Sequence, residues 1–206
     1  MRMCKHLQKE IDRERKSMTR MVVKIDKELA KKRKLFKLDI GAGDNKQPDF
    51  IGLDIRPTKN ARIVWDCEIT PYPFPNEVCD IVLMSHLMEH LNPKYVVDIL
   101  NEIWRITKVG GQLWLSMPYP LSHGFYQDPT HIKTWNETTP TYFDPQHYLY
   151  NIYKPKPWKV VQNSFFSYGN IEIVLEKRPL THGITPPGGY DQIQPEAKKT
   201  KKGGKK

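Results

Sequence analysis

The stretch Leu38-Asp39-Ile40-Gly41-Ala42-Gly43 decides the fold of this 206-residue chain. The apolar run Leu35–Ile40 predicts a short buried strand, and the glycines that end it let the backbone turn sharply and approach a ligand closely. Three similar runs follow, at Phe50–Ile55, Ala61–Trp65 and Asp80–Met84. Each run is short enough and apolar enough to be a further strand of one buried sheet.

A helix is predicted after the fourth of these runs. Asn92-Pro93 supplies an N-cap residue and a proline at the first helical position, and Gly110-Gly111 is expected to end the helix. Its buried face is expected to carry five apolar residues, namely Val96, Val97, Leu100, Ile103 and Trp104. A fifth strand is then predicted at Gln112–Met117.

Two further strands are predicted to close the domain, at Trp158–Val161 and Asn170–Lys177. In the second of them apolar residues alternate with glutamates, as expected of a half-exposed edge strand. Residues 118–157 lack clear periodicity, and a segment of that length is usually functional or a helix-loop insert. Strands alternating with helices predict an α/β domain whose mostly parallel sheet is covered on both faces.

The first part of the chain, residues 1–34, is predicted to be a basic amphipathic helical arm. Apolar residues recur there at three- and four-residue steps: Cys4, Leu7, Ile11, Met18, Met21, Val22, Ile25 and Leu29. Glu14 and Glu28 interrupt the heptad pattern, so a long coiled coil is not expected. The apolar stripe is expected to pack on the domain, on a partner protein or second copy, or over the active site as a lid.

The net charge of +10 is concentrated at the two ends of the chain. Residues 1–37 carry fourteen basic against five acidic residues, a net charge of +9, and residues 191–206 carry +4. The stretch between them carries −3. Basic arms of this kind bind nucleic acid without sequence specificity, or simply keep a protein soluble. We expect a domain over residues 35–180 and a disordered Lys-rich tail over 181–206.

Compartment and membrane association follow from composition. The three cysteines, Cys4, Cys67 and Cys79, have neither disulfide-framework nor zinc-site spacing, so a reducing, cytoplasmic location is expected. No apolar run approaches the ~20 residues that span a bilayer, and the first thirty residues contain no apolar core of a secretory signal. Neither membrane insertion nor secretion is therefore predicted.

The glycine turn and the acids around it predict the kind of ligand. The third glycine of a dinucleotide fingerprint would fall at Lys46, and Asp44 directly after the turn would repel a pyrophosphate. Asp54 ends the second strand, where a carboxylate can accept two ribose hydroxyls, although its spacing of eleven residues from Gly43 is shorter than usual. Asp66-Cys67, after the third strand, is placed to contact an adenine edge. The pattern favours a positively charged adenosine without phosphate.

Six motifs in order carry a family resemblance: DIGAG (39–43), FIGLDI (50–55), WDCE (65–68), PFPNEVCDIV (73–82), SHLMEHL (85–91) and EIWRITKVGGQLWLSMP (102–118). Together they resemble the class I S-adenosylmethionine-dependent methyltransferases, most closely the type 11 group. The resemblance implies a Rossmann-like, seven-stranded sheet with an antiparallel last strand, here with a shortened first crossover. It implies S-adenosylmethionine as cofactor, held by Asp39, Gly41, Ala42, Gly43, Asp54, Ile55, Asp66, Cys67, Ser85 and His86.

Within that resemblance, Asp39 and Gly41 would face the methionine end of the cofactor, and Ser85 and His86 would line the methyl-transfer mouth. Catalytic candidates lie in the segment His123–Trp135, where some members of the group have a similar D-P-T-H sequence. His131 is expected to be a base or substrate contact that Asp128 orients through a hydrogen bond, and His86 is a further candidate. Although His123, Asp128 and His131 contain two histidines and a carboxylate, no metal site is predicted.

The predicted function is transfer of a methyl group to an unidentified acceptor, which is a small molecule, a sugar or a nucleic acid. The alternative is a catalytically inactive Rossmann-like protein that binds nucleic acid through its basic arms. Neither the N/D-P-P-Y/F motif of DNA amino-methylating enzymes nor the Pro-Cys nucleophile of cytosine C5 enzymes occurs in the sequence. Cofactor binding by the domain alone would separate the two functions.

Overall fold

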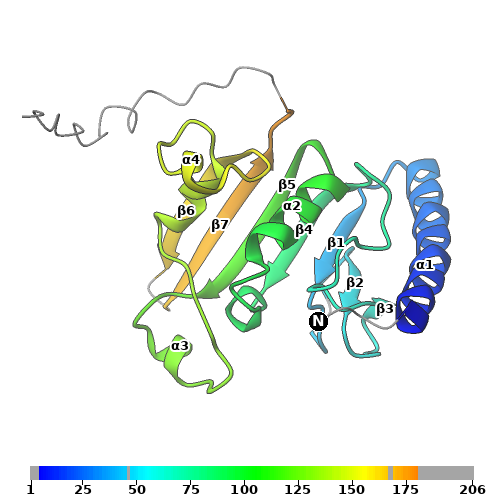
Figure 1. Cartoon of the computed structure of the whole chain (residues 1–206), viewed down its shortest axis with the longest axis horizontal. Helices are drawn as coiled ribbons and strands as arrows, with labels where there is room; N and C mark the ends of the chain where they lie inside the picture. Colours follow the sequence, from blue (N-terminus) through cyan, green and yellow to red (C-terminus); the bar gives the residue numbers. More distant parts are fainter. Residues whose placement is uncertain (1–4, 46, 167–168, 181–206) are drawn as a thin grey trace, which may run out of the picture.

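A seven-stranded sheet in the order β3-β2-β1-β4-β5-β7-β6 forms the centre of the molecule (Figure 1). The structure is a computed structural model and describes residues 5–45, 47–166 and 169–180. The strands are β1 (Lys37–Ile40), β2 (Ile51–Asp54), β3 (Ala61–Val64), β4 (Cys79–Ser85), β5 (Thr107–Pro118), β6 (Trp158–Phe166) and β7 (Asn170–Lys177). Strands β1 to β5 are parallel, and β7 is antiparallel to both of its neighbours. The predicted sheet is therefore confirmed.

The core lies on one face of this sheet. Leu38 of β1 pairs with Val82 of β4, which pairs with Leu113 of β5, so their side chains share a row on that face. Helix α2 (Val96–Ile106) covers the row with Ile99, Leu100, Ile103 and Ile106, all of them buried. Alternate side chains of each strand point to this face, and the apolar side of α2 packs against them. Together they form one buried apolar layer.

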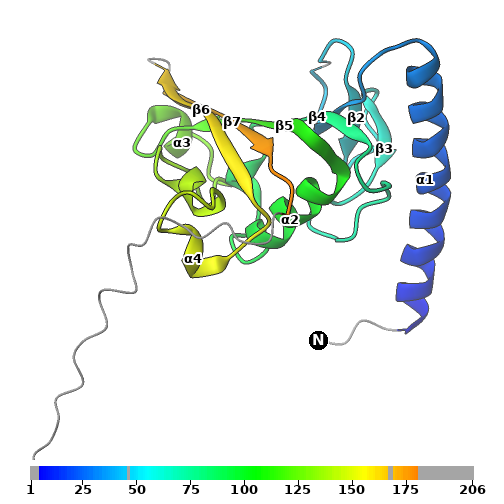
Figure 2. The ribbon, with the colours of Figure 1, turned by 90° about the horizontal axis from the view of Figure 1, so that it is seen from above.

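The opposite face of the sheet is only partly covered. Its residues, such as Leu83, Trp114 and Val174 in one cross-strand row, are half-buried, and Figure 2 shows α2 and α4 (Tyr150–Tyr153) together on the other side. The prediction of a sheet covered on both faces is therefore wrong. Residues 41–50 and 55–60, which connect β1 to β2 and β2 to β3, are too short for crossover helices of ordinary length.

The amphipathic helix of the N-terminal arm packs on the domain. Helix α1 (Lys5–Lys31) stands beside β3 at one edge of the sheet and buries Val22 and Ile25 completely or nearly so (Figures 1 and 2). It does not cover the carboxyl ends of the central strands, so the lid interpretation is wrong. No helix within the described ranges has the length and apolar character needed to cross a membrane.

Helix α2 differs from its prediction at both ends. A turn at residues 93–95 precedes it, and the Asn92 side chain accepts a hydrogen bond from Lys94 N at 3.0 Å in that turn instead of capping the helix. The helix ends at Ile106, and Gly110 and Gly111 lie inside β5. There the pairing of β4 and β5 shifts register, and a Cβ atom on Gly111 would lie 2.9 Å from Asp80 O. The two glycines therefore serve a bulge in the strand.

The last strand in the chain is not at the edge of the sheet. β7 lies between β5 and β6, and β6 forms the edge. The alternation of β7 was expected to mark an edge; it instead reflects one covered and one open face. The segment between β5 and β6 contains short helices only: α3 (His123–Tyr126), η2 (Thr139–Phe143) and α4. The predicted tail at 181–206 lies outside the described residues.

Candidate active site

The glycine turn after β1 is held against the end of β2 by hydrogen bonds from three successive amides. Gly41 N and Ala42 N both donate to Leu53 O, at 2.8 and 3.1 Å, and Gly43 N donates to Asp54 Oδ2 at 2.8 Å. Gly41 also has a φ of 79° and lies so close to Leu87 that a Cβ atom would be 3.0 Å from Leu87 Cδ2. The turn, Asp54 and Leu87 therefore form one closely fitted unit.

A cavity of about 240 Å³ opens beside this turn at the carboxyl ends of β1, β2 and β3. We call it the carboxylate cavity; it is lined by Gly41, Leu53, Asp54, Ile55, Trp65, Asp66, Cys67, Glu68, Leu87 and Leu91. Five of the ten residues predicted to bind the cofactor are thus brought together: Gly41, Asp54, Ile55, Asp66 and Cys67. Carboxyl ends of adjacent parallel strands meet at one edge of a sheet, which is why residues so distant in sequence converge.

The side chains of the carboxylate cavity suit a ribose and an adenine ring. Asp54 is only 5% exposed, and its two oxygens each accept one backbone hydrogen bond, from Gly43 N and from Arg56 N, both at 2.8 Å. Arg56 Nε also lies 3.5 Å from Oδ1, and each oxygen has a further lone pair that a ribose hydroxyl can use. Burial, with Asp66 as the second cause, raises the pKa of the Cys67 thiol to about 12, so this thiol is uncharged. The residues present therefore fit the adenosine of S-adenosylmethionine.

Other predicted cofactor residues lie apart from the carboxylate cavity. Asp39 and Ala42 line a separate cavity of about 580 Å³, together with Asp44 and Asn45. The Asp39 side chain belongs to the open face of the sheet, since its neighbours Leu38 and Ile40 point into the core. The structure thus does not place Asp39 and Gly41 around one cavity, as the resemblance implied. Ser85 lines neither cavity; its cross-strand partner is Ser116 of β5.

Replacing Asp39 with asparagine is expected to change the pH dependence of stability. Burial, and next the charge of Asp54, raises the pKa of Asp39 from 3.8 to about 6. The folded chain therefore binds this proton more tightly than the unfolded chain, and the stability it contributes is present below pH 3.8 and lost as the pH rises through 6. At pH 8 the ionised form costs up to ~3 kcal/mol.

Urea unfolding at pH 4 and pH 8 measures this effect. Asp39→Asn should unfold at higher urea concentration than the wild type at pH 8, and the difference should shrink at pH 4. Asp44→Asn is the matched control, because Asp44 is an exposed carboxylate on the same turn. An equal difference at both pH values would show that packing, and not ionisation of Asp39, separates the variant from the wild type.

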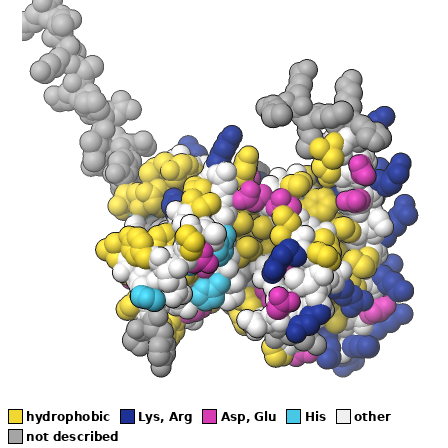
Figure 3. Space-filling model, turned by 90° about the horizontal axis from the view of Figure 1, so that it is seen from below, with side chains coloured by type: hydrophobic (Ala, Val, Ile, Leu, Met, Phe, Trp, Pro, Cys, Tyr) yellow, Lys and Arg dark blue, Asp and Glu magenta, His cyan; other side chains and the backbone are white. Residues whose placement is uncertain are grey.

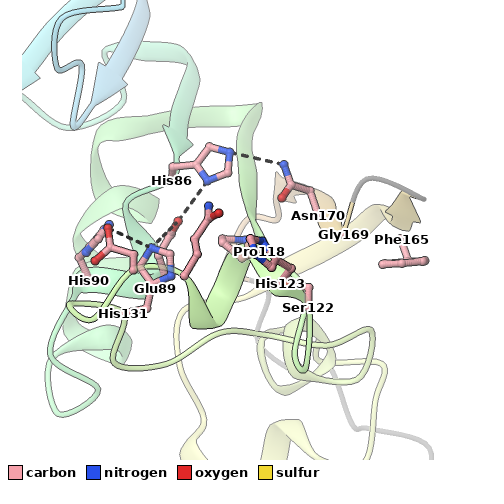
Figure 4. Close-up of a pocket in the computed structure, with 13 residues that line it drawn as sticks. His86, Glu89, His90, Pro118, Ser122, His123, His131, Phe165, Gly169 and Asn170 are labelled. Atoms are coloured by element: carbon pink, nitrogen blue, oxygen red, sulfur yellow. Dashed lines mark hydrogen bonds and ion pairs between the residues drawn. The ribbon is translucent and has the colours of Figure 1, made fainter.

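A second, larger cavity of about 740 Å³ lies at the carboxyl ends of β4 and β5 and at the start of β7 (Figure 4). We call it the histidine cavity; it is lined by His86, Glu89, His90, Pro118, Ser122, His123, Gly124, Gln127, Asp128, His131, Phe165, Gly169 and Asn170. In the view from this end, histidines gather on one part of the surface, and Lys and Arg side chains on another (Figure 3). The predicted catalytic residues His86, Asp128 and His131 all line it.

The segment 86–91 forms a wall between the two cavities. His86, Glu89 and His90 line the histidine cavity, whereas Leu87 and Leu91 line the carboxylate cavity. The segment follows β4 directly, includes the short helix η1 (Met88–His90), and begins with His86 at a φ of 51°. That left-handed residue turns the chain out of the strand, so that consecutive side chains face opposite cavities.

His86 is the residue of the wall nearest to the end of the parallel strands. Its Nδ1 lies 3.2 Å from Glu89 Oε1, and its Nε2 lies 3.4 Å from Asn170 Nδ2 (Figure 4). The hydrogen bond to Glu89 raises the pKa of His86 above its ordinary value, against the lowering effect of partial burial. Since a glutamate only accepts, Nδ1 carries the hydrogen, and Nε2 is the acceptor of the neutral ring, which receives a hydrogen bond from Asn170 Nδ2.

His131 is held differently from the expectation. Asp128 Oδ2 lies 3.9 Å from His131 Nε2, too far for a hydrogen bond, so the predicted orientation by Asp128 is wrong. His131 Nδ1 instead donates to Phe125 O at 2.8 Å, and its ring stacks on Phe125. Asp128 Oδ1 accepts from Thr130 N and Thr130 Oγ1, since a short Asx turn is the nearest source of donors.

Two residues of the site could not be assigned from the sequence. Glu89 is fully buried and lines the cavity with three histidines, yet no role was predicted for it from the sequence. Its position three residues after His86 was the available signal, because that spacing places two side chains together on one helical turn. Asn170 reaches the cavity only because β7 pairs with β5 at Pro118, a pairing that no local pattern reveals.

Comparisons with known proteins agree with this fold. Residues 38–115 match the profile of the family described as "Methyltransferase domain". A chain of the complex between the Haloferax volcanii Trm112 methyltransferase activator and a methyltransferase aligns with a TM-score of 0.54 and 17% identity over 72% of this chain and 84% of that one. A Pyrococcus horikoshii protein aligns with a TM-score of 0.50 and 13% identity over 73% and 85%.

A SAM-dependent methyltransferase from Archaeoglobus fulgidus aligns at 20% identity over 76% of this chain and 94% of that chain, with a TM-score of 0.49. A search of curated proteins finds no match. The matched segment 38–115 contains the glycine turn, Asp54, Asp66 and the wall at 86–91. Residues 38–115 therefore match the methyltransferase-domain family, and the sheet has the fold of the solved structures to which the chain is similar.

Proposed function

We propose that the chain transfers the methyl group of S-adenosylmethionine, bound in the carboxylate cavity, to a protonated oxygen or nitrogen of a small acceptor in the histidine cavity. The observation that supports this most is the wall at residues 86–91, which presents apolar side chains to one cavity and ionisable ones to the other. The larger cavity, of about 740 Å³, has the size of small-molecule sites. The acceptor class is therefore a small polar molecule or one unit of a sugar or nucleic acid.

On the cofactor side, the proposed roles follow from the contacts of the turn. S-adenosylmethionine, when bound, supplies an electrophilic methyl group on a positively charged sulfonium. Asp54 accepts the two ribose hydroxyls through the lone pairs that Gly43 N and Arg56 N leave free. Asp66 and Cys67 contact the adenine, and the backbone of Gly41 and Ala42 lies along the methionine part. Positioning of this kind supplies much of the rate enhancement of an in-line displacement.

On the acceptor side, His86 is the proposed proton acceptor. Glu89 fixes its Nδ1 hydrogen, so Nε2 has a lone pair at the histidine cavity. Asn170 Nδ2, 3.4 Å from Nε2, donates to this lone pair in the absence of a methyl acceptor, and the hydroxyl or amine of that acceptor would have to replace it. His131, which the sequence favoured as base, has its Nδ1 bound to Phe125 O, and we assign it to the floor of the cavity.

Calorimetry with S-adenosylmethionine and NAD tests the cofactor assignment. We expect the wild type to bind S-adenosylmethionine in the micromolar range and NAD negligibly. Asp54→Ala should weaken S-adenosylmethionine binding at least tenfold, because it removes the ribose acceptor and the anchor of Gly43 N. Asp44→Ala is the control and should bind as the wild type does. Equal binding by Asp54→Ala and the wild type would exclude Asp54 from the site.

Nucleic acid as a partner remains a prediction from the basic arms. The Lys and Arg side chains of α1 lie on a flank apart from the histidine cavity (Figure 3), so α1 would act as a separate contact and not as part of that cavity. Deleting residues 1–30 is a poor test, because it removes Val22 and Ile25 from the core. Substituting exposed lysines such as Lys9 and Lys16 with glutamine, and measuring RNA and DNA binding, leaves the core intact.

A further inference from the structure

Three potential metal ligands meet at the floor of the histidine cavity. Glu89, His90 and His131 each offer one ligand atom, and these atoms all lie within 4.8 Å of one another. The two imidazole rings are 4.7 Å apart between centroids, at 67°. Ile132 N donates to Glu89 O at 2.7 Å, so the loop that carries His131 is fixed to the turn that carries Glu89 and His90. The cluster is therefore held by backbone contacts from two segments.

The buried carboxylate of Glu89 is the observation that indicates a bound cation. Its side chain is 0% exposed, and its Oε1 already interacts with His86 Nδ1 at 3.2 Å. Its Oε2 is buried and has no hydrogen-bond partner within the parts of the chain that the structure describes. A buried carboxylate oxygen without a partner is costly, and such groups are paired or coordinate metals. A cation at the cluster would satisfy this oxygen and leave the contact with His86 in place.

The hydrogen bonds around both histidines leave the correct nitrogen free for a metal. His131 Nδ1 donates to the carbonyl of Phe125, so its Nε2 has a lone pair. Thr130 Oγ1 donates to Asp128 Oδ1 at 2.7 Å and therefore accepts from His90 Nδ1 at 3.1 Å, which leaves His90 Nε2 free as well. Metal-binding histidines almost always have their other nitrogen bound to a carbonyl or carboxylate in this way.

From these contacts we infer that Glu89, His90 and His131 bind a divalent transition-metal ion of the Zn²⁺ type. Two histidines and one carboxylate are a ligand set of catalytic zinc and of related metals with open coordination positions. Zinc–nitrogen bonds of about 2.0–2.1 Å require ligand atoms about 3.4 Å apart in a tetrahedron. Because the atoms lie up to 4.8 Å apart, binding would shorten their separations by at most ~1.4 Å. The partly exposed His90 can make such a movement.

The cluster of Glu89, His90 and His131 is not the group of two histidines and one carboxylate noted in the sequence, which was His123, Asp128 and His131. Asp128 Oδ1 is used by Thr130, and His123 lines the cavity without belonging to the cluster. The remaining coordination position of the ion faces the histidine cavity, where it would hold an oxygen or nitrogen of the acceptor. This role rests on the proposed function, whereas the binding of the ion does not.

Metal titration of the tag-free, chelator-treated protein tests the inference directly. We expect calorimetry to give one equivalent of Zn²⁺ per chain and Co²⁺ to show visible ligand-field bands. His90→Ala and Glu89→Gln should each weaken Zn²⁺ binding by at least ~100-fold. Thr130→Val should weaken it by about tenfold, because loss of an outer hydrogen-bond partner alone costs about 10–100-fold. His123→Ala is the matched control and should bind as the wild type does.

Two results would overturn the inference: no saturable Zn²⁺ binding by the wild type, or binding that His90→Ala and Glu89→Gln leave unchanged. Glutamine has nearly the shape of glutamate, and the partly exposed His90 leaves little void when shortened, so both variants are expected to fold. Binding of S-adenosylmethionine should persist in His90→Ala, because His90 does not line the carboxylate cavity. Failure of the metal site and failure of the cofactor site are thus measured separately.

Discussion

Replacing His86 with asparagine is expected to lower the rate of methyl transfer by about 10²–10⁴-fold, the usual contribution of a positioned general base. Asparagine keeps a polar side chain of similar length but has no nitrogen that accepts a proton. His86 is the ring that Glu89 Oε1 and Asn170 Nδ2 hold at the mouth of the histidine cavity. Transfer of the labelled methyl group of S-adenosylmethionine to pools of small molecules, sugars, nucleic acids and proteins identifies the acceptor. The rate of transfer to that acceptor is then compared between His86→Asn and the wild type.

The same experiment needs two controls. His147→Asn changes a histidine outside both cavities and should keep the wild-type rate. Affinity for S-adenosylmethionine, measured by calorimetry, should be the same in His86→Asn and the wild type, since Asp54 and the glycine turn are unchanged. If the His86→Asn variant retained more than about a third of the wild-type rate, His86 would be excluded as the proton acceptor of this reaction.

Gly52→Ala is expected to destabilise the fold by at least ~3 kcal/mol or to prevent folding, an effect at the upper end for added volume in a packed interior. Gly52 lies in β2 beneath the glycine turn. A Cβ atom there would overlap the carbonyl oxygen of Asn60 and lie 2.8 Å from the Cβ atom of Ala42. Neither neighbour is the far end of a flexible side chain, so β2 would have to separate from the turn or from β3.

Urea unfolding compares this variant with Gly124→Ala. A Cβ atom on Gly124 would meet nothing closer than 3.7 Å, an ordinary contact, so the control should differ from the wild type by less than ~1 kcal/mol. Similar unfolding midpoints for Gly52→Ala and the wild type would mean that the close approach at β2 is relaxed at little cost. Weaker binding of S-adenosylmethionine by any folded Gly52→Ala protein would reflect displacement of Ala42 and Gly43.

The sequence was sufficient to predict the sheet, and five of the ten residues predicted to bind the cofactor line one cavity. Short apolar runs predicted β1 to β4, and the convergence of Asp54 and Asp66 followed from the parallel arrangement alone. Patterns of this kind are local, because the apolar residues of each strand indicate by themselves that the strand is buried. Asp39 was expected to lie beside Gly41 at one end of the cofactor, but the two residues line separate cavities. The face of the sheet to which a side chain points is not encoded in a local pattern.

The wrong predictions for α2, β7 and the histidine cavity have related causes. Gly110-Gly111 has the appearance of a helix end, but register between β4 and β5 requires a bulge there. β7 alternates as an edge strand does, because one of its faces is open. The hydrogen bond of His131 to Phe125 and the approach of His131 to Glu89 arise between loops, where periodicity does not determine the geometry.

The direct connection from β1 to β2 also determines the electric field at the carboxylate cavity. Residues 41–45 and 47–50 contain no helix, so no helix dipole directs a positive end at the ligand, as it does where a pyrophosphate is bound. Asp54, Asp66 and Glu68 line the cavity instead. Even with Arg56 Nε 3.5 Å from Asp54 Oδ1, the carboxylates outnumber the basic groups here and should attract a sulfonium more than the neutral thioether that remains once the methyl group has gone. We therefore expect the spent cofactor to be held less tightly than the fresh one, which favours turnover.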